Sequence, residues 1–103
     1  MRGMQDMLRQ AQLMQKKMAA IQEELKTREV EATSGGGMVT VKVTGGQELL
    51  SVTIDKSVVE AGDVEMLQDL VLAATRDALK KAKTMTEEEM SKVTGGMKIP
   101  GMF

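Results

Sequence analysis

Basic side chains recur at helical spacing in two parts of the chain. The first set, spaced by sevens, comprises Arg2, Arg9, Lys16 and the neighbouring Lys17. The second set, spaced i, i+4 and i+7, comprises Arg76, Lys80, Lys83 and the adjacent Lys81. On a helix such spacings place charges in one row. Rows of cations can bind phosphate oxygens without reading a sequence, but a row of charges is also the ordinary solvated face of a helix.

Most of the side chains that enzymes use are missing from the sequence. There is no His, Cys, Tyr or Trp, which removes the usual general base, every thiol nucleophile and the commonest metal ligands. No serine lies in a Gly-x-Ser-x-Gly pattern, and no Gly-x-x-x-x-Gly-Lys-Ser/Thr pattern occurs. The acidic run 87–89 is typical of a solvated helix turn. We therefore expect no enzyme, no metal and no cofactor.

Size and composition indicate one small domain that self-associates. The chain has 103 residues and one aromatic, Phe103, so aliphatic residues and methionine must form its core. A domain of this size buries only about 60–65 % of its unfolded surface, which favours a homodimer. The net charge is −1, so any nucleic-acid site must be a local basic patch. The lack of cysteine suits a reducing cytoplasm, and no apolar run approaches a membrane span of about 20 residues.

An unbroken heptad pattern predicts a long helix at 3–27. Steps of three and four residues separate Met4, Met7, Ala11, Met14, Met18, Ile21 and Leu25. This is a coiled-coil seam, and the first basic row lies opposite it. Methionine is adaptable packing material, so the seam can pack on the sheet or on a partner helix. A protein-interaction module that binds another protein's helix is therefore the alternative function. Residues 2–18 could also lie on a membrane surface, although we expect no membrane partner.

Glycine clusters and alternating apolar residues predict a three-stranded antiparallel meander. The strands are expected at 29–34, 38–44 and 48–55, with turns at Gly35–Gly37 and Gly45–Gly46. We interpret the glycines as turn residues that supply positive φ. One face of the sheet needs a cover, either in the core or in a dimer, and it carries Val39, Val41, Val43, Leu50, Val52 and Ile54.

A second helix and a short tail complete the chain. The helix is expected at 64–92 with Asp63 as its N-cap, and Thr86 followed by Glu89 resembles a capping box, which predicts a pause near Thr84. The predicted fold is α+β, with an α-β-β-β-α protomer at 1–93. Residues 94–103 form a Gly/Met tail without periodicity, which we expect to be flexible. The apolar tail residues that could dock on a partner are Met97, Ile99, Met102 and Phe103.

The charge pattern and the composition together favour one kind of nucleic acid. Without aromatic platforms, the sequence disfavours specific recognition of single-stranded RNA. Binding of double-stranded DNA through shape and phosphates fits better.

An ordered set of motifs resembles the YbaB/EbfC family of bacterial nucleoid-associated proteins. The motifs are Met14-Gln-Lys-Lys-Met18, Ile21-Gln-Glu-Glu-Leu25, the segment 34–43, Val52-Thr-Ile-Asp55 and Met66-Leu-Gln-Asp-Leu-Val71. The resemblance implies an α-β-β-β-α protomer and a homodimer built largely through the sheets, with protruding helices. It further implies binding to double-stranded DNA on the cytoplasmic nucleoid, in chromosome organisation or gene regulation. Protruding helices are the family's proposed DNA clamp, which implies contacts from Arg9, Lys16, Lys17, Arg76, Lys80 and Lys83.

Overall fold

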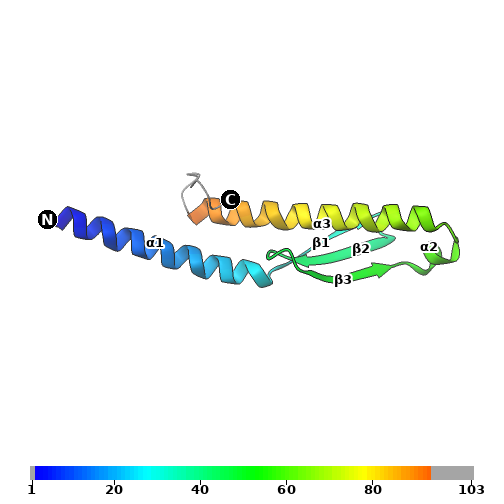
Figure 1. Ribbon diagram of the computed structural model, residues 1–103, viewed down its shortest axis with the longest axis horizontal. Helices are drawn as coiled ribbons and strands as arrows, with labels where there is room; N and C mark the ends of the chain where they lie inside the picture. Colours follow the sequence, from blue (N-terminus) through cyan, green and yellow to red (C-terminus); the bar gives the residue numbers. More distant parts are fainter. Residues whose placement is uncertain (1, 94–103) are drawn as a thin grey trace.

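The protein is an elongated α+β unit in which one helix projects beyond the rest (Figure 1). This computed structural model describes residues 2–93, and the predicted tail at 94–103 lies outside the described residues. The elements in order are α1 (Arg2–Thr27), β1 (Glu29–Ser34), β2 (Val39–Thr44), β3 (Leu49–Ile54), α2 (Lys56–Glu60) and α3 (Val64–Val93). The predicted α-β-β-β-α order is confirmed, and the short α2 lies between β3 and the last helix.

The molecule is rod-shaped because its two long helices overlap only in part. Its extents are 73 × 19 × 18 Å. α3 runs back along the sheet toward α1, and the N-terminal half of α1 extends past the end of α3 (Figure 1). The three strands form one antiparallel sheet in the order β1-β2-β3.

The main core lies between α3 and the first two strands. Val39, Val41 and Val43 on β2 are fully buried against an alanine stripe on α3, at Ala74, Ala78 and Ala82. Alanine adds little bulk, so the helix axis can lie close to the valines. A helix is about 10 Å across and strands are about 4.8 Å apart, so one helix covers about two strands.

The third strand shares that face of the sheet but stays uncovered. Val52 lies opposite Val41, and Ile54 lies opposite Val39, in the β2–β3 register. Leu50, Val52 and Ile54 are nevertheless exposed, because α3 packs on β1 and β2. The apolar face predicted from the sequence is therefore split: its β2 half is protomer core, and its β3 half is an apolar edge strip.

The two glycine turns have different physical causes. In the first turn Gly35, Gly36 and Gly37 all adopt positive φ, as predicted. In the second turn the prediction was wrong, because the left-handed residue is Gln47, at φ 66°. Gly45 is needed there for a close approach, since a Cβ on it would overlap the carbonyl oxygen of Leu25.

Replacing Gly45 by alanine is expected to destabilise the fold, because the overlapping atom is backbone and cannot turn aside. Overpacking of this kind costs about 1–3 kcal/mol, which lowers the melting temperature by several degrees in a domain of this size. The matched control is Gly46→Ala, whose Cβ would lie 3.4 Å from the nearest atom, the Lys26 carbonyl oxygen. Thermal unfolding followed by circular dichroism compares the two variants, and equal melting temperatures would contradict the argument.

The last helix runs without the predicted pause. α3 is continuous from Val64 to Val93. The Thr86 hydroxyl oxygen lies 3.0 Å from the Ala82 carbonyl oxygen and 3.4 Å from the Gly45 carbonyl oxygen, so its one proton is shared between these two acceptors. It is therefore engaged with the preceding turn and cannot cap a new helix. This contact also fastens the second turn of the sheet to α3.

A polar cap begins the short helix α2. The Asp55 carboxylate accepts hydrogen bonds from the Ser57 hydroxyl and from the Ser57 backbone N–H, which lower the pKa of this carboxyl below its ordinary 3.8. A carboxyl with a lowered pKa stabilises the fold above its unfolded pKa, and this contribution is lost as the pH falls through the lowered value. The cap is therefore fully charged near neutral pH.

Candidate nucleic-acid interface

The C-terminal half of α1 is anchored on the end of α3. Met18 and Leu25 are buried in a cluster with Met90, and Ile21, Met85 and Val93 pack around them. Full burial of one such side chain contributes about 1.5–3 kcal/mol. This cluster therefore fixes the direction in which the rest of α1 projects.

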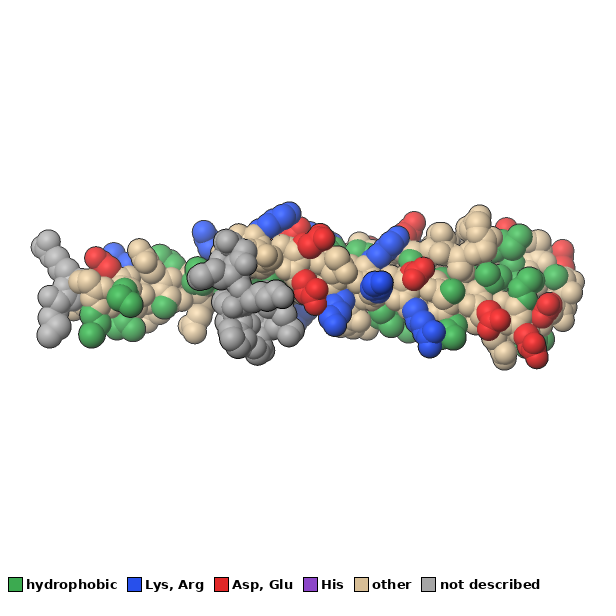
Figure 2. All heavy atoms as spheres, turned by 90° about the horizontal axis from the view of Figure 1, so that it is seen from above, with side chains coloured by type: hydrophobic (Ala, Val, Ile, Leu, Met, Phe, Trp, Pro, Cys, Tyr) green, Lys and Arg blue, Asp and Glu red, His purple; other side chains and the backbone are tan. Residues whose placement is uncertain are grey.

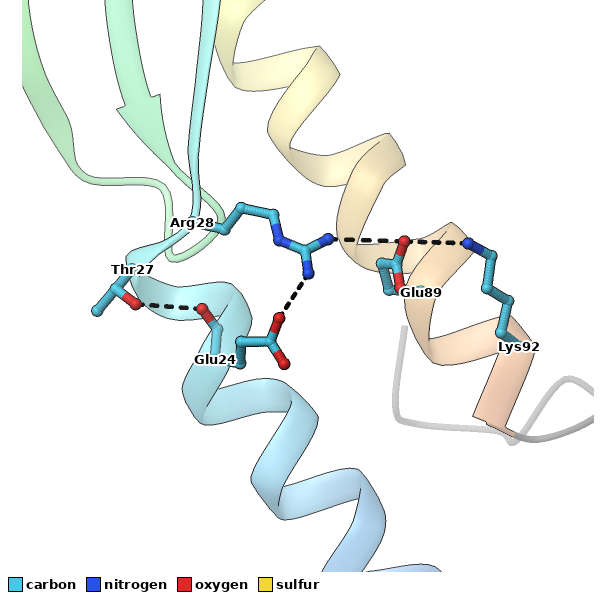
Figure 3. Close-up of polar contacts among 5 residues, drawn as sticks. All are labelled: Glu24, Thr27, Arg28, Glu89 and Lys92. Carbon is cyan, nitrogen blue, oxygen red and sulfur yellow. Dashed lines mark hydrogen bonds and ion pairs between the residues drawn. The ribbon is translucent and has the colours of Figure 1, made fainter.

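An arginine at the end of α1 links the two long helices through carboxylates (Figure 3). Arg28 Nη2 lies 2.6 Å from Glu24 Oε1, and Arg28 Nη1 lies 3.6 Å from Glu89 Oε1. Lys92 contacts the same Glu89 oxygen at 3.2 Å. Exposed pairs of this kind contribute at most about 1 kcal/mol, so the apolar cluster holds α1 and the ion pairs orient it. Sequence reasoning missed Arg28; its i, i+4 spacing from Glu24 was a signal, but nothing in the sequence pointed to Glu89.

Six predicted DNA contacts are exposed and lie on the two long helices. They form an α1 patch of Arg9, Lys16 and Lys17 and an α3 patch of Arg76, Lys80 and Lys83. Within residues 2–93, none of the six takes part in an ion pair. The neighbouring Lys81 instead donates to the Glu31 carbonyl oxygen at 3.3 Å, which draws it toward the sheet. Within residues 2–93 these six side chains are therefore among the cations free to meet an external anion.

The two patches do not share one face of the protomer. The methionine seam of α1 faces α3 at its C-terminal half, so Arg9 and Lys16, on the opposite side of the helix, point away from α3. The α3 patch lies opposite the alanine stripe that packs on the sheet. Viewed from the α3 side, Lys and Arg side chains gather over the middle of the rod (Figure 2). A single rigid surface on one protomer cannot use both patches.

Local charge differs in sign from the net charge of the chain. Residues 2–20 carry four basic side chains and one acid, Asp6, a local charge of +3 against −1 for the whole chain. The part of α1 at residues 2–20 is therefore a cationic segment on a slightly acidic protein.

Comparison with known families identifies the family of this chain. The sequence model of the YbaB/EbfC DNA-binding family matches residues 1–97. The chain belongs to this family.

Relatives of this YbaB/EbfC member support the assignment over nearly its full length. A nucleoid-associated protein of Alkaliphilus metalliredigens is 52 % identical over 101 residues, which cover 98 % of this chain and 89 % of the relative. One from Syntrophobacter fumaroxidans is 52 % identical over 95 residues, 92 % of this chain and 86 % of the relative. The crystal structure of the uncharacterized protein HP0035 from Helicobacter pylori is similar, with a TM-score of 0.71 and 29 % identity over 82 % of this chain and 89 % of that one.

A shallow hollow on α3 of this YbaB/EbfC member has mixed charge. Its volume is about 360 Å³, and its lining residues are Asp77, Lys80, Lys81, Thr84, Met85 and Glu88. Two lysines and two carboxylates cancel in formal charge, so the hollow does not select an anion. Contacts from the α3 patch to phosphate must therefore form at the outer edge of this hollow.

The described part of this YbaB/EbfC member offers neither a metal site nor a membrane-spanning helix. Residues 2–93 contain no group of three or more side chains placed to hold a metal ion. Within the same residues, no helix is both long enough and apolar enough to cross a membrane.

Proposed function

We propose that this protein binds double-stranded DNA as a homodimer, through phosphate contacts from the α1 and α3 patches and with little sequence specificity. Its role is chromosome organisation or gene regulation on the nucleoid, in the cytoplasm, and it is not an enzyme. Membership of the YbaB/EbfC DNA-binding family carries the proposal, together with relatives that are named nucleoid-associated proteins.

The state of the basic side chains supports phosphate binding. A cation already paired with a carboxylate must give up that pair to bind a phosphate, whereas an unpaired cation gives up only solvent and counterions. Lys26 and Lys92 are paired with Glu23 and Glu89, but the six patch residues are unpaired within 2–93. Contacts from lysine and arginine to phosphates carry no sequence information directly, so binding that rests on them has little sequence specificity.

The uncovered edge of the sheet supports the homodimer. Exposed apolar edge strands invite pairing with another chain, and contiguous exposed apolar surface marks an interaction site. Here the strip comprises Leu50, Val52 and Ile54 on β3. A second copy packed on this strip buries it and doubles the number of basic patches. Because a dimer has two α1 and two α3 patches, patches that diverge on one protomer can act together across the pair.

The protein-interaction module is the weaker candidate. The exposed half of the α1 seam offers an apolar surface, but the family assignment favours DNA.

Titration of duplex DNA at two salt concentrations tests the proposal. With about six phosphate contacts, affinity is expected to fall about 10³-fold between 50 and 200 mM salt. Fluorescence anisotropy measures the affinity, and light scattering of the same samples measures the mass. Absence of binding to any duplex at low salt would refute DNA binding, and a monomeric mass at binding concentrations would refute the dimer.

A further inference from the structure

The projecting half of α1 carries an apolar seam that no described residue in 2–93 covers. The seam residues are Met4, Met7, Ala11 and Met14, flanked by Leu8 and Leu13. Met4 is 66 % exposed and Met7 is 71 % exposed. Hydrophobic side chains accordingly lie open on the projecting end of the rod (Figure 2). Such a continuous apolar stripe marks a docking surface.

The contact between α1 and the end of α3 shows where a segment bound to the open seam would lie. The same heptad stripe continues into Met18 and Leu25, which pack against the end of α3. A straight helix drifts only about 20° per heptad from this stripe, so Met14 and Met7 face nearly the same direction. The open seam therefore lies on the side of α1 that faces α3. In Figure 1 the projecting half of α1 extends past the end of α3, whose last described residue is Val93.

The chain that follows Val93 has the length and composition to fill this place. Val93 itself packs on the Met18–Leu25 cluster, so the described chain ends beside the start of the open seam. Met4 and Met14 are about 15 Å apart along the helix, and ten extended residues span up to about 33–36 Å. The apolar side chains of that segment are Met97, Ile99, Met102 and Phe103.

We propose that residues 97–103 dock on the open seam of α1 in the same chain. A segment tethered at Val93 meets the seam at an effective concentration of the order of millimolar, well above that of a second copy at micromolar protein. Docking buries the exposed methionines while Arg9 and Lys16, on the other side of α1, stay free. The exposed seam thus favours a docked tail over the flexible one expected from the sequence.

The single aromatic residue provides the test. Phe103 is the only aromatic in the chain, so its ring is the only source of aromatic ring-current shifts. In full-length protein with ¹³C-labelled methionine methyls, Phe103→Leu is expected to move the Met4 or Met7 methyl resonance and to leave Met85 and Met90 in place. Unchanged Met4, Met7 and Met14 resonances would overturn the proposal.

Cross-linking distinguishes the tail of the same chain from a second copy. The chain has no cysteine, so Met7→Cys with Met102→Cys gives one defined pair. After unlabelled and ¹⁵N-labelled chains are refolded together, the link is expected within single chains only, and links of mixed mass would assign the seam to a second copy. Gln5→Cys with Met102→Cys is the control, because Gln5 lies well off the seam, and it should link much more slowly. Equal rates for both pairs would mean that the tail does not dock.

Discussion

Replacing Arg9, Lys16 and Lys17 together by glutamine is expected to flatten the salt dependence of DNA binding. In a dimer these changes remove half of the patch cations. Of about six phosphate contacts, about three are then lost, each of which contributes about 0.9 to the salt slope, so the slope falls by about 3. Affinity at 50 mM salt should drop at least about 100-fold on the same reasoning. Anisotropy titrations across a salt series measure both quantities. The same replacement at Arg76, Lys80 and Lys83 is expected to act in the same direction.

A control variant with three matched substitutions distinguishes the effect of the patches from the effect of net charge. Replacing Lys26, Lys56 and Lys92 by glutamine removes the same formal charge, but Lys26 and Lys92 are already held by Glu23 and Glu89. This control should keep a salt slope close to that of the unmodified protein. If it loses as much affinity as the α1 triple, net charge governs binding and the site assignment fails. Because all the altered side chains are exposed, the melting temperatures should stay similar.

Replacing Val52 by aspartate is expected to dissociate the homodimer. Val52 is 47 % exposed in the protomer, so the protomer tolerates a charge there. A dimer packed on β3 would bury that charge without a partner, at about 3–5 kcal/mol, which is at least about 100-fold in the dissociation constant. Light scattering or sedimentation at micromolar concentration should then give a monomeric mass. DNA affinity should fall with it, because a monomer offers half as many contacts.

A second exposed apolar residue controls for the added charge. Leu72 on α3 is 48 % exposed and lies off the sheet, so Leu72→Asp matches the exposure and the charge of the test variant. This control is expected to stay dimeric. A Val52→Asp protein that keeps a dimeric mass would place the interface elsewhere. Circular dichroism should show the same helix content in both variants, since neither side chain belongs to the protomer core.

Local periodicity explains why the order of elements was predictable. The seven-residue pattern of α1 and the period of two in the strands are properties of neighbouring residues, and they persist however the elements pack. The alternation at Val39, Val41 and Val43 therefore predicted both the strand and its apolar face. The same locality placed Arg9 and Lys16 in a row opposite the methionine seam.

Contacts between distant segments explain why several predictions from the sequence were wrong or incomplete. The turn glycine Gly45 is required by the Leu25 carbonyl, twenty residues earlier, and no turn pattern records that contact. Arg28 meets Glu89 only because α1 and α3 run antiparallel and overlap at one end. Thr86 bonds to Gly45 across the fold instead of capping a new helix.

The sequence by itself determined the elements, their apolar faces and the rows of positive charge. Only the tertiary structure decided which parts of those faces remain open. One helix is wide enough for about two strands, so α3 covers β1 and β2 and leaves Val52 and Ile54 on β3 exposed. Because α1 overlaps α3 only near Met18 and Leu25, the first half of its seam stays free. The relative lengths and positions of packed elements set these boundaries, and a local pattern carries no information about them.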